Sequence, residues 1–185
     1  MRIIGGLYRG KKIFSPLSEK VRPTSDRARE SVFNILTSKL LKPWSQINLA
    51  DIFAGTGAFA FEALSRGAQS VTLIDIDISS ATKNAALFSS EKNKIEIIKA
   101  DATRLFSAPR TFDIIFLDAP YHKGLNEQAI TAILQKKWLS DDGICIVETA
   151  ADETLHFPTE LNLIDKRRYG VAQFWFLALK TSTQI

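Results

Sequence analysis

Residues 51–60 read DIFAGTGAFA and lie between an apolar, strand-like run at 47–50 and the run FAFEAL at 59–64, whose apolar spacing suits a helix. Gly55 and Gly57 have no Cβ, so a ligand can come close to the backbone of the turn between the strand and the helix. The helix start offers unpaired N–H groups and a partial positive charge. The pattern predicts a site for an anionic or polar nucleotide-like ligand, although a plain tight turn can have the same glycines.

The next predicted strand supplies a carboxylate that supports this interpretation. It covers 71–75 and ends in Asp75. A carboxylate at that strand end can accept two hydrogen bonds from the hydroxyls of a ribose. The glycine turn and Asp75 together predict a cofactor that contains a nucleoside.

Length and composition indicate a single globular domain. The chain has 185 residues, of which 45% are hydrophobic and 24% charged, which are ordinary globular values. Its one cysteine, Cys145, lies in an apolar run, which predicts a buried thiol and excludes a disulfide within the chain. Apolar runs of the ~18 residues that a membrane helix needs are absent, and residues 1–5 lack the apolar core of a secretion signal. We therefore expect a cytoplasmic monomer with no membrane partner.

The charge is distributed unevenly along the chain. Residues 1–42 contain ten basic and three acidic side chains, whereas the rest is slightly acidic, and the net charge is +4. A basic N-terminal part on a mildly acidic body predicts a polyanionic partner, and a solvated basic face is the alternative. The basic residues near Tyr8 and Phe14 suit backbone phosphates and exposed bases. The candidate RNA contacts are Arg9, Lys11, Lys12, Arg22 and Arg27.

From residue 47 onward, strand-like and helix-like segments alternate, which predicts an α/β fold. Apolar runs such as 114–117 suit a parallel sheet that is covered on both faces. The last two segments flank Gly170 and predict a C-terminal antiparallel hairpin at the edge of the sheet. The predicted strands are 47–53, 71–75, 95–99, 112–118, 143–149, 161–169 and 171–179, and the predicted helices are 58–66, 79–89 and 124–138, with a short turn at 102–107.

The N-terminal part differs from this alternation. Residues 1–14 are short strand-like pieces broken by glycine, which predicts a small β-hairpin. A helix then starts near residue 26, with Ser25 or Thr24 as its N-cap. We expect residues 1–21 to form a basic extension that binds RNA, and residues 22–185 to form the main domain. A decorated hairpin packed on that domain is the alternative.

Acidic side chains stand at the ends of the predicted parallel strands, where open parallel sheets bind ligands. Asp51 precedes the glycine turn and can brace it. Asp101 can receive an adenine amino group, and the N–H of Ala102 can meet an adenine acceptor. For Asp101 alone, however, a cap or a solvated loop carboxylate is the favoured interpretation.

The tetrapeptide Asp118-Ala119-Pro120-Tyr121 follows the fourth predicted strand and carries the most specific chemistry. The Asp118 carboxylate and the Ala119 carbonyl can accept the two hydrogens of an exocyclic amine. Pro120 pushes Ala119 toward an extended conformation, which helps to aim that carbonyl. Tyr121 offers a flat face for a base, so the tetrapeptide predicts a pocket for an amino-bearing nucleobase. A proline turn with a core tyrosine is the alternative.

This tetrapeptide resembles the (Asp/Asn)-Pro-Pro-(Tyr/Phe) motif of methyltransferases that modify amino groups, and residues 51–58 resemble their cofactor loop. The segments IGGLYRG at 4–10 and RPTSDRARESVFN at 22–34 are similar to the RsmD family of bacterial small-subunit ribosomal RNA guanine-N2 methyltransferases. The resemblance extends from Arg2 to Leu179. The chain departs from the motif at Ala119, where the family usually has proline, but the accepting carbonyl belongs to the backbone and is retained.

The resemblance implies a Rossmann-like methyltransferase fold for residues 22–185 and S-adenosylmethionine as the cofactor, with S-adenosylhomocysteine as the product. It implies methyl transfer to one guanine of 16S ribosomal RNA, in an assembling small subunit. Asp118, Ala119, Pro120 and Tyr121 would form the catalytic group. The expected cofactor contacts are Asp51, Phe53, Gly55, Gly57, Asp75, Ile76, Asp101 and Ala102. No metal is expected, because His122 and His156 are few and far apart.

Two other functions fit part of the sequence. The glycine turn with Asp75 also matches the fingerprint of an NAD-dependent oxidoreductase. That class would need a proton donor, and Leu125 stands where a lysine would follow Tyr121. A catalytically silent RNA-binding factor for ribosome assembly is the other alternative, favoured by Ala119 and opposed by the intact Asp118.

Overall fold

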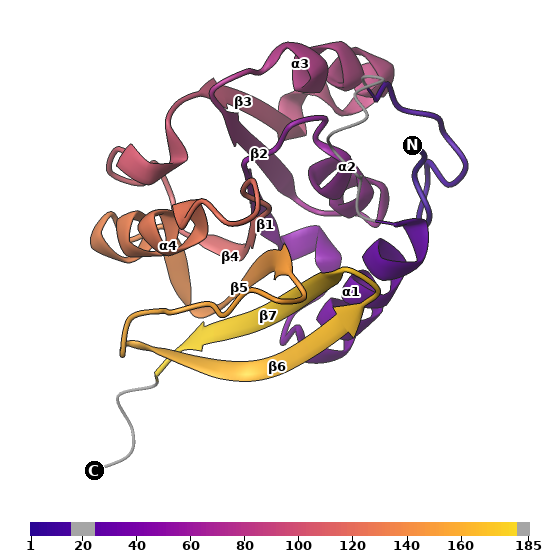
Figure 1. Cartoon of the computed structure of the whole chain (residues 1–185). Helices are drawn as coiled ribbons and strands as arrows, with labels where there is room; N and C mark the ends of the chain where they lie inside the picture. Colours follow the sequence, from indigo (N-terminus) through magenta and orange to yellow (C-terminus); the bar gives the residue numbers. More distant parts are fainter. Residues whose placement is uncertain (16–24, 181–185) are drawn as a thin grey trace.

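The computed structural model describes residues 1–15 and 25–180 of the chain (Figure 1). Within these residues, seven strands form one sheet in the order β3-β2-β1-β4-β5-β7-β6. The first five strands pair in parallel, and β7 and β6 add an antiparallel hairpin at one edge. The bounds are β1 Asn48–Ile52, β2 Ser70–Asp75, β3 Ile95–Lys99, β4 Phe112–Leu117, β5 Leu139–Ala150, β6 Leu161–Tyr169 and β7 Ala172–Leu179.

The order of the parallel strands reverses between β1 and β4. From β1 the chain moves outward to β2 and β3, and then returns to place β4 on the other side of β1. In open parallel sheets, ligands bind beside the carboxyl ends of the strands at such a switch point. The glycine turn after β1 and the tetrapeptide after β4 lie at that point, as the sequence predicts.

Helices cover both faces of the sheet. Residues of α1 (Asp26–Lys39) and α2 (Ala58–Ser65) pack in one core cluster, and residues of α4 (Leu125–Gln135) pack in the other. Strand β1 feeds both clusters, because its successive side chains alternate between the faces. The remaining helical segments are α3 (Ser79–Ala85) and the 3₁₀ segments η1 (Trp44–Gln46), η2 (Ala86–Lys94) and η3 (Ala102–Arg104).

The N-terminal segment is docked on the main domain. Within residues 1–15, an isolated antiparallel bridge joins Arg2 and Lys12, where the sequence predicts a β-hairpin. Ile3 and Ile13 are buried in the core cluster that contains α1 and α2. The backbone N–H groups of Ile4 and Gly5 donate to the buried carboxylate of Glu62 on α2, at 2.7 and 2.8 Å. Removing this segment would uncover core side chains and leave a buried carboxylate without these donors.

Tertiary packing also moves the predicted helix ends. The helix predicted at 79–89 ends at Ala85 and continues as η2, inside which Phe88 has non-helical dihedral angles. The Phe88 ring stacks on Phe61 of α2 with the ring centroids 4.8 Å apart. Ser25 caps α1 by accepting a hydrogen bond from the N–H of Ala28, which confirms the predicted helix start.

Candidate active site

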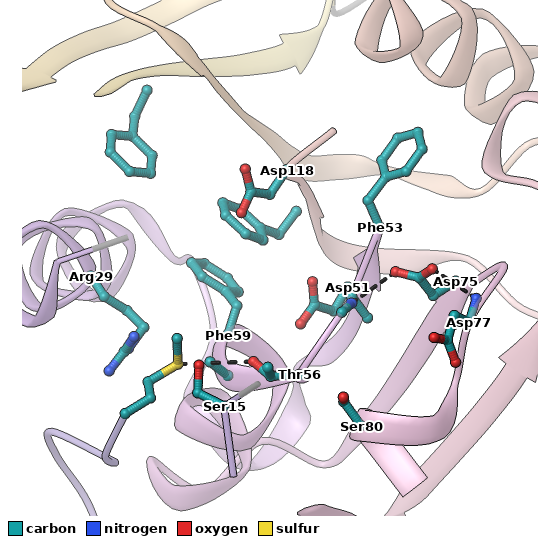
Figure 2. A pocket seen from close by; sticks show the side chains of 16 residues that line it. Ser15, Arg29, Asp51, Phe53, Thr56, Phe59, Asp75, Asp77, Ser80 and Asp118 are labelled. Atoms are coloured by element: carbon teal, nitrogen blue, oxygen red, sulfur yellow. Dashed lines mark hydrogen bonds between the residues drawn. The ribbon is translucent and has the colours of Figure 1, made fainter. Parts of the chain in front are cut away.

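A cavity of about 320 Å³ lies at the carboxyl ends of β1, β2 and β4 (Figure 2). Five residues predicted as cofactor or catalytic residues line it, and they come from three different strand ends. These residues are Asp51, Phe53, Gly55, Asp75 and Asp118. The fold therefore brings together acids that are far apart in the sequence, because the carboxyl ends of parallel strands meet at one edge of the sheet.

The turn after β1 is held in an unusual backbone shape. Phe53, Gly55 and Gly57 have φ angles of 63°, 53° and 75°. The N–H of Gly55 donates to Asp75 Oδ2 at 2.8 Å, and the N–H of Asp77 donates to Asp75 Oδ1 at 3.0 Å. Because a carboxylate has about four lone-pair sites, Asp75 can still accept hydrogen bonds from a ligand.

The two glycines of the turn face different surroundings. A Cβ added at Gly55 would meet open space, which suits the close approach of a ligand to the backbone. A Cβ at Gly57 would come within 2.4 Å of Leu73 Cδ2 and 2.6 Å of Phe61 Cε2. Gly57 does not line the cavity, and its small size serves the packing of α2 against β2.

Asp51 lies near the end of β1, just before the turn, and is 2% exposed. Its Oδ2 accepts a hydrogen bond from the N–H of Ala60, in the first turn of α2, at 3.0 Å. Burial raises the pKa of Asp51 to about 8; the bond from Ala60 opposes this shift, and the charge of Asp75 adds to it. A cationic group that entered the cavity would relieve the cost of ionising this carboxyl group.

Asp118 has a second carboxylate beside it that the sequence analysis missed. In the β4–β5 register, Leu117 pairs with Val147, so Asp118 and Glu148 follow on adjacent strands. Burial, then the charge of Glu148, then that of Asp51 raise the pKa of Asp118 well above its usual range. A signal for Glu148 was available, because it is the one charged residue in the apolar run that begins at Gly143.

The tetrapeptide after β4 is held by a hydrogen-bond network that reaches the same glutamate. The N–H of Ala119 donates to Asn126 Oδ1 at 3.4 Å, and Asn126 Nδ2 donates to the backbone oxygen of Glu148 at 3.0 Å. The Tyr121 hydroxyl donates to Glu148 Oε1 at 3.0 Å. Burial and the nearby charge of Glu148 raise the pKa of Tyr121, so this hydroxyl stays protonated.

Arg29 of α1 is a further residue of the cavity wall that the sequence analysis did not assign. It is 2% exposed, and its Nη2 donates to the backbone oxygen of Arg2 at 2.7 Å and to Asp26 Oδ1 at 3.2 Å. Its Nε has no hydrogen-bond partner among the residues that the structure describes. In Figure 2, Arg29 enters from the side opposite Asp75. The cavity therefore has a carboxylate at one end and a buried cation at the other.

Three other predicted cofactor residues do not line this cavity. Asp101 accepts hydrogen bonds from the N–H and Oγ1 of Thr103, which cap η3 and lower the pKa of Asp101. Ala102 is buried in the core cluster that contains α4, and Ile76 is exposed. The cap that the sequence favoured for Asp101 is what the structure contains.

The predicted RNA contacts fall into two places. Arg9 and Lys12 are exposed on the N-terminal segment. Lys11 lies over the ring of Phe88, with its Nζ 5.0 Å from the centroid, and donates to a backbone oxygen. Arg27 lines a second cavity beside Tyr121. Arg22 lies outside the described residues.

Within residues 1–15 and 25–180, no group of three or more His, Cys, Asp or Glu side chains is arranged to hold a metal ion. The helices in this part of the chain are also too short or too polar to cross a membrane.

The sheet order, the glycine turn after β1 and the helices on both faces define a Rossmann-like methyltransferase fold. The family called Conserved hypothetical protein 95 matches residues 1–178, and the chain belongs to this family, the RsmD family that its sequence resembles. The ribosomal RNA small subunit methyltransferase D of Haemophilus influenzae is 35% identical over 180 residues, which cover 94% of this chain and 91% of the relative.

Two solved structures place the fold among known ones. The yhhF protein of Escherichia coli has a TM-score of 0.81 at 27% identity and covers 97% of this chain and 98% of its own. A Burkholderia thailandensis 1,6-didemethyltoxoflavin-N1-methyltransferase, solved with S-adenosylhomocysteine bound, has a TM-score of 0.64 at 17% identity, covering 86% of this chain and 80% of its own. The second likeness concerns the fold alone.

Proposed function

We propose that this protein transfers a methyl group from S-adenosylmethionine to the exocyclic N2 amine of a guanine in small-subunit (16S) ribosomal RNA. The observation that carries the proposal is the position of the tetrapeptide after β4. Asp118 lines the cavity that Asp75 and the glycine turn share, whereas Tyr121 lines the adjoining cavity. One short segment thus faces both a nucleoside-cofactor site and a site for an acceptor base. Membership of a family with ribosomal RNA methyltransferases supports the substrate class.

The cavity residues fit S-adenosylmethionine. Asp75 would hold the ribose hydroxyls, and the open face of Gly55 would admit the ligand close to the backbone. Arg29, with its unpaired Nε, would receive the carboxylate of the methionine part. The buried carboxylates of Asp51 and Asp118 would favour a positive charge between the two ends. S-adenosylmethionine supplies a methyl group bonded to a positively charged sulfur.

The chain's own contribution to the reaction is orientation and charge. The N2 amine of guanine is a weak nucleophile, because its lone pair is delocalised into the ring. Asp118 and the Ala119 carbonyl would accept its two hydrogens and aim the lone pair at the methyl carbon. The amine becomes cationic as the new N–C bond forms and the C–S bond breaks, and the Asp118 carboxylate stabilises that charge and can take the released proton.

Methylation of small subunits that lack the modification tests the proposed function. Single-turnover reactions with S-adenosylmethionine, followed by mass mapping of the 16S RNA, should give one added methyl group on the N2 atom of one guanine. Free 16S RNA, run in parallel, would tell whether the assembling subunit is required. A methyl group on another atom, or calorimetric binding of NAD in place of S-adenosylmethionine, would overturn the proposal.

Replacing the proposed ribose acceptor should weaken cofactor binding. We expect Asp75→Ala to cost about 1.5–3 kcal/mol of S-adenosylmethionine affinity, as for a hydrogen bond to a charged group. Asp75→Asn should cost less, because one oxygen remains for the Gly55 N–H. Isothermal titration calorimetry measures both. An exposed carboxylate of β5 that lines neither cavity, Asp141, provides the control Asp141→Asn, and equal losses in all three variants would refute the assignment.

Neutralising the exposed basic residues should change the salt dependence of RNA binding. Arg9→Gln, Lys12→Gln and Arg27→Gln should each lower the slope of log affinity against log salt by about one and leave cofactor affinity unchanged. Point variants serve better than a deletion, because the N-terminal segment contributes Ile3 and Ile13 to the core. Lys136→Gln, at the exposed end of α4, is the control. An unchanged slope in all the test variants would place the RNA elsewhere.

A further inference from the structure

The second cavity has a volume of about 510 Å³ and lies between the start of α1, the tetrapeptide and the β6–β7 turn. It adjoins the first cavity, because neighbouring residues line the two: Arg29 and Asp118 line the first, and Ala28 and Tyr121 line the second. Its volume falls in the range of cavities that take small ligands, about 300–1,000 Å³. Its position beside Tyr121 is where an acceptor base would enter.

The charges of this cavity are ordered from wall to rim. Glu148 is 2% exposed and lies in its wall. Arg27 of α1 and Arg168 of β6 are exposed and belong to the same cavity. A nucleotide has the matching order, since its base edge offers N–H donors and its phosphates are anionic. Cationic groups at the rim would hold the phosphates beside a base that has turned into the cavity.

Glu148 is held in one position by its neighbours. Its Oε1 accepts the Tyr121 hydroxyl at 3.0 Å, and its backbone oxygen accepts Asn126 Nδ2 at 3.0 Å. A carboxylate has about four lone-pair sites, so Glu148 can accept hydrogen bonds from several donors at once. Leu117 and Val147 are partners in the β4–β5 register. Asp118 is the next residue after Leu117, and Glu148 is the next residue after Val147. Two acceptors therefore stand side by side on adjacent strands.

Two adjacent acceptors match guanine and reject adenine. The pairing edge of guanine carries two neighbouring donors, the N1–H and the N2 amine. Adenine has one donor, its N6 amine, and its N1 is an acceptor that would face the carboxylate. We propose that Glu148 is the residue that selects guanine, by accepting the N1–H beside the amine that Asp118 accepts. This inference rests on the proposed function and names the specificity residue of the same site.

The test uses 2-aminopurine, which keeps the N2 amine but has an acceptor at N1. Small subunits are reconstituted with RNA that carries 2-aminopurine in place of the methylated guanine, and single-turnover rates are compared with those for guanine. The wild-type protein should prefer guanine by about a hundredfold, because a buried acceptor facing an acceptor is strongly disfavoured. Glu148→Gln should reduce this preference at least tenfold, since its amide can donate to N1. Glu153→Gln is the matched control, from a partly buried carboxylate just beyond β5, and should keep the wild-type preference.

A second measurement needs no variant at Glu148. Inosine keeps the N1–H but lacks the amine, and unsubstituted purine lacks both, so RNA with inosine at the target should inhibit wild-type methylation more strongly than RNA with purine there. Unchanged selectivity in Glu148→Gln, or equal inhibition by the two RNAs, would overturn the role of Glu148 while leaving guanine methylation intact. If the wild-type protein methylates no guanine at all, the proposed function itself fails, and the two failures are distinguishable.

Discussion

Asp118→Ala should lower the rate of methyl transfer roughly a hundredfold to a thousandfold, by analogy with the removal of one preorganised transition-state contact. The change removes an acceptor for the amine and the carboxylate that favours its developing charge. Cofactor affinity should change little, because Asp75 and the glycine turn remain. Asp118→Asn keeps an acceptor oxygen but loses the charge, so its rate should fall between those of the wild type and Asp118→Ala. Single-turnover methylation of unmodified small subunits measures the series.

The electrostatic surroundings of Asp118 indicate that a lower rate in its variants would not come from unfolding. Burial and the charges of Glu148 and Asp51 raise the pKa of Asp118 in the folded protein above its unfolded value. The stability that the folded state gains from the protonated Asp118 is therefore present at low pH and is lost as the pH rises through the folded-state pKa. Removing the carboxylate should therefore not destabilise the fold electrostatically. Wild-type turnover should increase with pH as Asp118 ionises, and Asp118→Asn should lack that increase. Transfer at the wild-type rate by Asp118→Ala would show that the tetrapeptide is only a turn.

Gly57→Val should destabilise the whole fold by about 2–6 kcal/mol, combining the cost of a left-handed backbone with that of an overpacked core. The φ angle of 75° disfavours a β-branched residue, and the added Cβ would lie 2.4 Å from Leu73 Cδ2. A loss of this size is a large part of the 5–15 kcal/mol that stabilises a typical domain. Urea denaturation followed by circular dichroism measures it.

Gly55→Ala is the matched variant in the same turn. Its φ angle of 53° is also left-handed, but the added Cβ would meet nothing within 4 Å. We expect a stability loss of only about 1 kcal/mol for it, together with weaker S-adenosylmethionine binding. If Gly57→Val folds with wild-type stability and fails only in cofactor binding, Gly57 acts on the ligand and the packing argument is wrong.

Local sequence patterns were sufficient for much of this protein. Apolar runs such as 114–117 predicted buried parallel strands, because only strands covered on both faces are apolar throughout. The glycine turn predicted the start of α2, and the two segments around Gly170 predicted the β6–β7 hairpin. Acids at strand ends predicted the cavity, since parallel strands end at the same edge.

The N-terminal segment shows where local patterns stop. Its glycines and basic residues predicted a hairpin, but the segment is held by Glu62 and by burial of Ile3 and Ile13, which are interactions with distant residues. Asp101 shows the opposite case, because the cap that it forms with Thr103 is an interaction between residues close together in the sequence, and the sequence predicted it.

The sequence by itself determined the sheet, the turn and the family, because those depend on hydrophobic periodicity and on residues close together in the chain. Only the tertiary structure decided that Glu148 stands beside Asp118 and that Arg29 is buried in the cavity wall. A lone glutamate in a strand or a lone arginine in a helix normally faces water. The apolar run around Glu148 hints that it is buried, but no local pattern names the residue that it stands beside. Strand register and the packing of α1 on the sheet bring these charges into the interior, where burial gives them their chemical role.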